Sequence, residues 1–219
     1  MKKIVTDILN QKYFEETEAP MRIPDCFWEW SLVWLEPSIK KQQWLGLGGA
    51  ITQASCFNYQ KLSKEKQQEL LRLYYSNEGL NYQYGRLPIG SQDFGTENYS
   101  YSCQEDLKDF SIEKDRQILF PLLKDILAFK KISLLASPWS PPAFMKDSNN
   151  LLDGGKLKKE YYALYAEYLV KYLKKYQQEK NLLIILLFKM NHLLNKNGNL
   201  AYGQPKNNKI LSIIILFQD

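Results

Sequence analysis

The chain has 219 residues, a formal net charge of +5 at pH 7 and 45% hydrophobic residues. This length permits one domain or a truncated barrel, because a complete α/β barrel typically has about 250 residues. The basic residues are scattered over amphipathic segments without a dense cluster, which argues against nucleic acid as a partner.

Cysteine and histidine are too few and too far apart for several kinds of active site. Cys26, Cys56 and Cys103 are widely spaced, and the only histidine is His192. This pattern indicates neither a zinc site nor a disulfide framework, and it argues against Ser-His catalysis. Phosphate-loop and dinucleotide-binding fingerprints are also missing. We therefore expect no metal and no cofactor, and any hydrolase chemistry should depend on carboxylates.

The first 44 residues predict a lead-in of short strands or irregular structure. They are rich in aromatic residues but lack helical periodicity. Asp7, Asn10 and Gln11 interrupt the apolar run near the N-terminus, so this segment does not resemble a signal peptide. No segment supplies about 18 uninterrupted apolar residues, so we expect no transmembrane helix.

Strand-like and helix-like segments alternate from residue 44 onward. A short apolar segment, WLGLGGA (44–50), contains glycines where backbones approach closely. Residues 63–76 predict an amphipathic helix that Ser63 caps and Gly79 ends. A strand follows within residues 80–90, and we expect Pro88 to end its ladder.

A polar and aromatic loop of about 20 residues comes next, a length typical of functional or flexible loops. Residues 113–130 then predict a helix in which Pro121 marks a kink or a late start. Residues 132–136 have the apolar pattern of a strand covered on both faces. The prolines that follow leave Trp139 presented at the carboxyl end of this strand. The local pattern alone fits either a functional tryptophan or one that packs in the core.

A helix over 157–178 and a strand over 182–188 complete the alternation. Such an order implies parallel strands with right-handed crossovers. The pattern by itself fits either a barrel or an open doubly wound sheet.

Five segments in combination resemble glycoside hydrolase family 30, and most closely its glucosylceramidase branch. They occur in order, cover about residues 44–180, and read GLGGAITQASCFN (46–58), GLNYQYGRLPIGSQDF (79–94), YSYS (99–102), ISLLASPWSPPAFMK (132–146) and LKKEYYALYAEYLVKYLKKY (157–176). The resemblance implies an α/β fold, a (β/α)8 TIM barrel. About its first four β/α units would occupy residues 45–188, after the β-rich or irregular lead-in of residues 1–44. It also implies retaining hydrolysis of a β-glucosidic bond, which yields glucose and ceramide in sphingolipid catabolism.

The resemblance assigns three substrate-binding residues. Trp139 would line the glucose subsite, and Arg86 would join the hydrogen bonds around the catalytic carboxylates. A structural ion pair is the alternative role of Arg86. Gln53 replaces the aspartate that the family's GGAxTDA motif places on sugar hydroxyls, and glutamine can still donate and accept hydrogen bonds.

The resemblance also implies partners and a location. The partner would be a glycolipid or another β-glucoside, presented at a membrane surface in the glycolipid case. The family's lysosomal or secreted habit calls for a signal peptide that this N-terminus does not show, so localisation stays open.

Both catalytic glutamates of the family are missing from the sequence. Retaining hydrolysis needs two carboxylates about 5 Å apart. The fourth strand should end in Asn-Glu-Pro, but residues 188–192 read FKMNH, and no glutamate follows Glu179. The acid/base glutamate is expected at about Met190 and Asn191, and the nucleophile beyond the C-terminus. We therefore expect no catalytic residue in this frame.

The genetic code suggests a reason for the missing acid/base glutamate. Met190 is ATG and Asn191 begins with AA, so a frame shifted by one base reads GAA, which encodes glutamate. With permitted third bases the shifted frame reads Gln-Asn-Glu-Pro across residues 188–192. We predict that the chain leaves the ancestral frame between about residues 180 and 188, and that residues 189–219 are an out-of-frame or disordered tail.

Three hypotheses follow from these observations. The chain is the N-terminal portion of a glucosylceramide-hydrolysing β-glucosidase, or it is a catalytically inactive fragment or pseudoenzyme that retains sugar or lipid binding. The third hypothesis is a family relative that acts on a polysaccharide. The missing glutamates favour inactivity for the chain as written, whereas the resemblance favours a glycosidase lineage.

Overall fold

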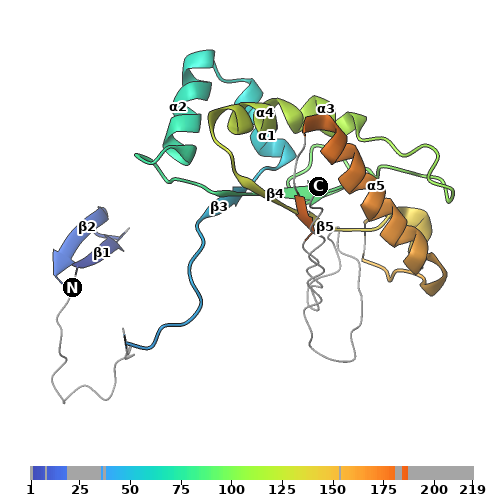
Figure 1. Cartoon of the computed structure of the whole chain (residues 1–219), viewed down its shortest axis with the longest axis horizontal. Coiled ribbons are helices and arrows are strands. Elements are labelled where there is room, and N and C mark those ends of the chain that lie inside the picture. The colour runs from blue at the N-terminus through green and yellow to red at the C-terminus, as the bar shows by residue number, and fades with distance from the viewer. Residues whose placement is uncertain are drawn as a thin grey trace. The chain divides into compact units, whose positions relative to one another are not determined.

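The computed structural model describes residues 2–7, 9–18, 36, 38–152, 154–180 and 184–186. Its contacts divide the chain into two units, Met1–Trp44 and Leu45–Asp219. The first unit contains an antiparallel pair of strands, β1 (Lys2–Asp7) and β2 (Lys12–Glu18), drawn in blue in Figure 1. The tryptophans at positions 28, 30 and 34 of the predicted lead-in lie outside the described residues.

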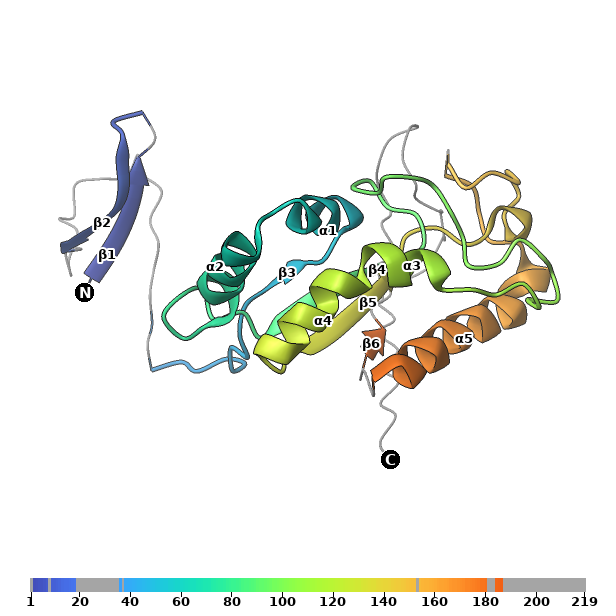
Figure 2. The same ribbon diagram turned by 90° about the horizontal axis from the view of Figure 1, so that it is seen from above.

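The second unit is built on a four-stranded sheet with the order β3-β4-β5-β6. Its strands are β3 (Gly48–Ala50), β4 (Tyr84–Ile89), β5 (Ser133–Pro138) and β6 (Ile184–Leu186). Each neighbouring pair is parallel. The spatial order follows the chain order (Figure 2), as in successive strands of a barrel. The predicted parallel alternation is therefore confirmed.

Helices connect these strands, and Figure 1 shows the first four of them on one side of the sheet. They are α1 (Gln53–Gln60), α2 (Lys64–Tyr75), α3 (Glu113–Ile118), α4 (Phe120–Phe129) and α5 (Tyr162–Lys180). Short 3-10 turns cover Ala143–Met145 and Lys159–Tyr161. Within the described ranges, no helix combines the length and the apolar character that a membrane crossing requires.

The core follows the alternation of side chains along the central strands. Leu87 of β4 and its partner Ala136 of β5 are both 0% exposed, as is Ile126 of α4. Residues of the other parity, such as Arg86 and Ser137, point to the opposite face of the sheet. One face of the sheet therefore supplies the hydrophobic core, and the other is available for polar groups.

Pro88 does not end the ladder of β4, so this prediction was wrong. β4 pairs with β5 as far as Ile89, and Pro88 lies opposite Ser137. The Tyr84 N–H donates to the Leu47 carbonyl on the β3 side, and Pro88 faces the same side four residues later. β3 has already ended at Ala50, so the missing N–H of Pro88 removes no strand hydrogen bond.

The helix predicted over residues 63–76 is α2, and the Ser63 hydroxyl caps it by accepting the Lys66 N–H. This helix ends at Tyr75 with Ser76 as its C-cap, not at Gly79 as predicted. Gly79 lies in the following turn, where a Cβ atom would come within 2.1 Å of the Leu73 carbonyl oxygen. The glycine thus marks a close backbone approach and not the helix end.

Two further helices differ from the sequence expectations. The predicted helix over 113–130 is divided at Leu119 into α3 and α4, so Pro121 marks a late start in the first turn of α4. Helix α1 was not predicted. Its signal in the sequence was Thr52 followed three residues later by Ser55, which form a capping box.

Candidate functional site

The carboxyl ends of β3, β4 and β5 lie at one edge of the sheet because the three strands are adjacent and parallel. In α/β barrels, the segments that follow these strand ends carry the functional side chains. Here they contain Gln53, three residues after the end of β3, the loop of residues 90–112 after β4, and Trp139 directly after β5. The three predicted substrate-binding residues therefore lie in or beside consecutive strands.

Arg86 and Trp139 are in contact. The Arg86 Nε donates a hydrogen bond to the Ser137 Oγ at 2.9 Å, and the Arg86 Cζ lies 5.5 Å from the centroid of the Trp139 ring. This distance suits a cation–π interaction. Both side chains are half-buried. Among the residues that the structure describes, Arg86 forms no ion pair, so that alternative role has no support among them.

A buried lysine anchors the loop that begins with Trp139. The Lys146 side chain is fully buried, and its Nζ donates to the Ser140 Oγ at 3.1 Å and to the Leu151 carbonyl oxygen at 3.2 Å. Hydrogen bonds from a charged donor are stronger than neutral ones, and a buried ammonium requires them. Lys146 therefore ties together the two sides of the 3-10 turn that follows Trp139.

Gln53 occupies the first position of α1 and is 0% exposed. Its Oε1 accepts the Thr96 N–H at 2.8 Å, which joins α1 to the loop after β4. The Gln53 Nε2 has no hydrogen-bond partner among the described residues. In the same part of the chain, no hydrogen bond or ring contact joins Gln53 to Arg86 or Trp139. The structure thus brings Arg86 and Trp139 together, whereas Gln53 is buried at the start of α1 and contacts the loop after β4.

Asp93 is a candidate site residue that the sequence analysis did not single out. It is exposed, and no hydrogen bond or ion pair joins its carboxylate to another described residue. It lies four residues after Ile89, the last residue of β4. A carboxylate at this edge of the sheet can accept hydrogen bonds from hydroxyl groups. Its position just after a strand end was the signal that could have identified it.

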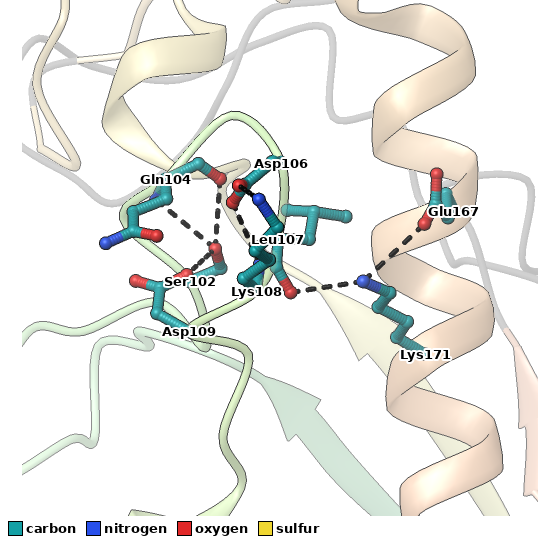
Figure 3. Close-up of polar contacts among 8 residues, drawn as sticks. All are labelled: Ser102, Gln104, Asp106, Leu107, Lys108, Asp109, Glu167 and Lys171. Atoms are coloured by element: carbon teal, nitrogen blue, oxygen red, sulfur yellow. Dashed lines mark hydrogen bonds and ion pairs between the residues drawn. The ribbon is translucent and has the colours of Figure 1, made fainter.

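The loop of residues 90–112 is ordered by polar contacts (Figure 3). The Ser102 hydroxyl donates to the Asp109 carboxylate, which also accepts the Cys103 N–H at 2.8 Å. On α5, Lys171 Nζ donates to the Leu107 carbonyl oxygen at 3.1 Å and pairs with Glu167 at 3.5 Å. The loop expected to be functional or flexible is therefore packed against a helix.

Comparison with known proteins identifies the fold and the family. Residues 44–213 match the model of the glycosyl hydrolase family 30 TIM-barrel domain. The chain belongs to glycoside hydrolase family 30. The predicted fold class, a (β/α)8 barrel that is incomplete here and preceded by a short β-rich segment, is confirmed.

Relatives of this family 30 chain include enzymes with different substrates. Lysosomal acid glucosylceramidase of Mus musculus is 36% identical over 155 residues, which cover 66% of this chain and 30% of that protein. SrfJ from Salmonella typhimurium superposes with a TM-score of 0.73 at 30% identity, covering 92% of this chain and 46% of that chain. An endo-β1,6-glucanase superposes with a TM-score of 0.70 at 27% identity, covering 78% and 40%. The family 30 chain thus spans less than half the length of these relatives.

Met190 and Asn191, where the acid/base glutamate is expected, lie outside the described residues. The predicted tail over residues 189–219 lies outside as well. The match to the family model extends to residue 213, and the proposed change of frame stays a prediction. Among the described residues, no cluster of histidine, cysteine, aspartate or glutamate could hold a metal ion.

Proposed function

We propose that this chain is the N-terminal part of the barrel of a retaining β-glycosidase that hydrolyses glucosylceramide to glucose and ceramide. The observation that carries the proposal is the half-buried Trp139 beside Arg86 at the carboxyl ends of β4 and β5, in a chain of glycoside hydrolase family 30. The 36% identity to lysosomal acid glucosylceramidase supports the choice of substrate.

In this proposal Trp139 is the platform for the glucose ring. The C–H groups on one face of a β-glucoside lie against the indole and exclude water from it. Arg86 lies over the same ring, and its bond to Ser137 fixes the direction of the guanidinium group. Its remaining N–H groups form a planar fork that suits a carboxylate. They would orient the catalytic carboxylates next to the bound sugar.

Gln53 and Asp93 would act together on the sugar hydroxyls. Asp93 is exposed and can accept hydrogen bonds directly. Gln53 is buried and holds the loop of Asp93 through the Thr96 N–H. We therefore assign direct contact with the sugar to Asp93, and support of the loop to Gln53.

The chemistry requires a general acid/base and a nucleophile about 5 Å apart. The resemblance places the first at about residues 190–191 and the second beyond residue 219. We propose that the complete barrel supplies both groups and that residues 1–219 alone bind the sugar without turning it over. Hydrolysis of a fluorogenic β-glucoside by the purified chain would contradict this part of the proposal.

Titration of the 219-residue chain with a monomeric alkyl β-glucoside tests the sugar site. We expect Trp139→Ala to weaken binding about tenfold or more, because it removes the stacking surface, and Trp139→Phe to retain part of the affinity. Trp44→Ala is the matched control, since Trp44 is a tryptophan of the first unit, is 75% exposed and is not among the predicted site residues. Equal affinities of wild type and Trp139→Ala would reject the assignment.

A second candidate substrate is a β1,6-linked glucan. The observation that favours it is the likeness to an endo-β1,6-glucanase, at 27% identity. The same titration separates the two candidates if a β1,6-linked glucose disaccharide is compared with the alkyl β-glucoside. Tighter binding of the disaccharide supports the polysaccharide, and tighter binding of the alkyl glucoside supports the glycolipid, because its aglycone is apolar.

A further inference from the structure

Asp115 is a buried carboxylate to which the proposed mechanism gives no role. It lies on α3 and is 0% exposed. Its oxygens accept hydrogen bonds from the hydroxyls of Tyr99, of Tyr101 at 2.6 Å and of Tyr176 at 2.6 Å. No lysine or arginine side chain that the structure describes forms an ion pair with it. The buried charge therefore depends on these three phenol groups for its stabilisation.

Two of the three tyrosines are also hydrogen-bonded to the residues that follow β4. The Gly90 N–H donates to the Tyr101 hydroxyl at 3.1 Å, and Gly90 follows Ile89, the last residue of the strand. Ser91 forms a reciprocal pair with Tyr99: the Ser91 N–H donates to the Tyr99 carbonyl oxygen at 3.1 Å, and the Ser91 Oγ accepts the Tyr99 N–H at 2.6 Å. Asp115 is thus connected through single residues to the two positions from which the loop leaves the sheet.

The third tyrosine brings a separate element to the same carboxylate. Tyr176 lies on α5 and is 0% exposed. Tyr168 lies on the same helix, eight residues before Tyr176, and its hydroxyl accepts the Tyr101 N–H at 3.0 Å. The polar contacts of Tyr101 therefore reach α3, α5 and Gly90, the residue that follows β4. A residue with these connections determines where the start of the loop lies relative to the strand end.

We propose that Asp115 is a positioning residue for the sugar-binding loop that follows β4. Through Tyr99 and Tyr101 it holds Gly90 and Ser91, and so it determines where Asp93 stands at the carboxyl edge of the sheet. This inference rests on the proposed function, because it gives the loop its role in sugar binding. The alternative is a purely local core contact that leaves the loop unaffected.

Asp125 provides a matched control within the same chain. It lies on α4 and accepts the Tyr59 hydroxyl from α1 at 2.7 Å. It therefore resembles Asp115 in joining two elements through a tyrosine. No described contact connects it to the loop of residues 90–112. Asp115→Asn and Asp125→Asn remove the same charge, but only the first should release the loop.

Hydrogen–deuterium exchange of the 219-residue chain measures the position of the loop directly. In Asp115→Asn, the hydroxyls of Tyr99 and Tyr101 lose their hydrogen bonds to a charged carboxylate, so both tyrosines are held less firmly. We therefore expect the amides of Gly90, Ser91 and Tyr99 to exchange about tenfold faster or more than in the wild type. Amides within α2 should not change. Asp125→Asn should leave all of the loop amides as they are in the wild type.

If Asp115→Asn does not fold, Tyr101→Phe is the second variant with which the proposal is tested. This variant removes only the hydroxyl between Gly90 and Asp115, and Tyr59→Phe is its control. Faster exchange at Gly90 in Tyr101→Phe, together with weaker binding of the alkyl β-glucoside, supports the proposal. Unchanged exchange at Gly90 overturns it, and so does faster exchange with unchanged affinity.

The two proposals fail in distinguishable ways. If the wild-type chain does not bind the alkyl β-glucoside, the proposed function fails and sugar positioning by Asp115 fails with it. If the wild type binds and the variants bind equally well, only the role of Asp115 is overturned. The exchange rates report on the anchoring of Gly90 and Ser91 in both cases.

Discussion

Arg86 and Trp139 meet because the register of two adjacent parallel strands is fixed. Arg86 pairs with Leu135, and residues of that parity on β5, including Ser137, point to the same face. Trp139 follows two residues later. The Arg86 Nε can therefore reach the Ser137 Oγ while the guanidinium group lies over the indole. At the scale of single residues, strand register thus creates the contact.

We expect Arg86→Lys to weaken binding of an alkyl β-glucoside about three- to tenfold. Lysine keeps the positive charge but has no planar fork, so both the bond to Ser137 and the stacking on Trp139 are lost. Isothermal titration measures the change. Arg72→Lys on the exposed surface of α2 is the control. A variant that binds like the wild type would show that the charge alone is sufficient.

The cysteines Cys56 and Cys103 should react very differently with iodoacetamide. Cys56 is 0% exposed, and burial raises the pKa of its thiol to about 12, whereas Cys103 is exposed. At about pH 8 the thiolate, which is the reactive form, is therefore almost absent at Cys56. Peptide mass mapping should find Cys103 modified in the native chain and Cys56 only after unfolding. Equal rates at both residues would contradict the structure.

At the scale of elements, the start of α1 couples stability to the site. Thr52 caps this helix through a capping box with Ser55, and the next residue, Gln53, holds Thr96 in the loop after β4. Ser63 caps α2 in a comparable way but contacts no site residue. Comparing variants of the two caps therefore distinguishes the effect of a helix cap on stability from its effect on the loop after β4.

Thr52→Ala and Ser63→Ala should each lower the free energy of unfolding by about 1 kcal/mol, the usual cost of losing an N-cap side chain. Urea denaturation measures this change. Only Thr52→Ala should also speed amide exchange at Thr96, because Gln53 loses its fixed position. Faster exchange at Thr96 in both variants would indicate general loosening and not a local coupling.

The order of elements was predictable from the sequence, whereas their ends depended on neighbours in space. The apolar pattern of β5 and the amphipathic pattern of α2 identify both elements locally. Pro88 removes no strand hydrogen bond because β3 has already ended beside it. The sequence of β4 alone does not contain the position at which β3 ends. Helix α1 escaped prediction because it is short and its buried residues include the polar Gln53.

At the scale of the whole molecule, four parallel strands are half of a closed barrel. β3 forms one edge of the described sheet, and Leu47 beside it is 51% exposed. Exposed edges and apolar side chains favour association with other chains. In a complete family 30 barrel, this edge would pair with a later strand.

Asp115 should give the stability of the whole chain a characteristic pH dependence. Burial raises its pKa above the ordinary value of 3.8, although the tyrosine hydroxyls oppose the shift. The folded chain therefore binds a proton at Asp115 more readily than the unfolded chain. This contribution to stability is fully present below the ordinary pKa and is lost as the pH rises through the raised pKa of the folded state.

Asp115→Asn removes this contribution. The free energy of unfolding of the wild type, minus that of the variant, should therefore fall as the pH rises from about 3.8 and then level off. Urea denaturation over a series of pH values measures the difference, in which the other acidic groups cancel. A difference that is constant or that rises with pH would contradict the raised pKa.

The sequence by itself determined the alternating elements, the parallel sheet and the family, because apolar periodicity and ordered motifs are local properties of the chain. Only the tertiary structure decided that Arg86 reaches Ser137, 51 residues away, and that Asp115 receives the hydroxyl of Tyr176, 61 residues away. It also decided that Gln53 is buried and that its Oε1 accepts the Thr96 N–H. Such contacts depend on how side chains of different elements pack together, which the pattern of any one segment does not contain.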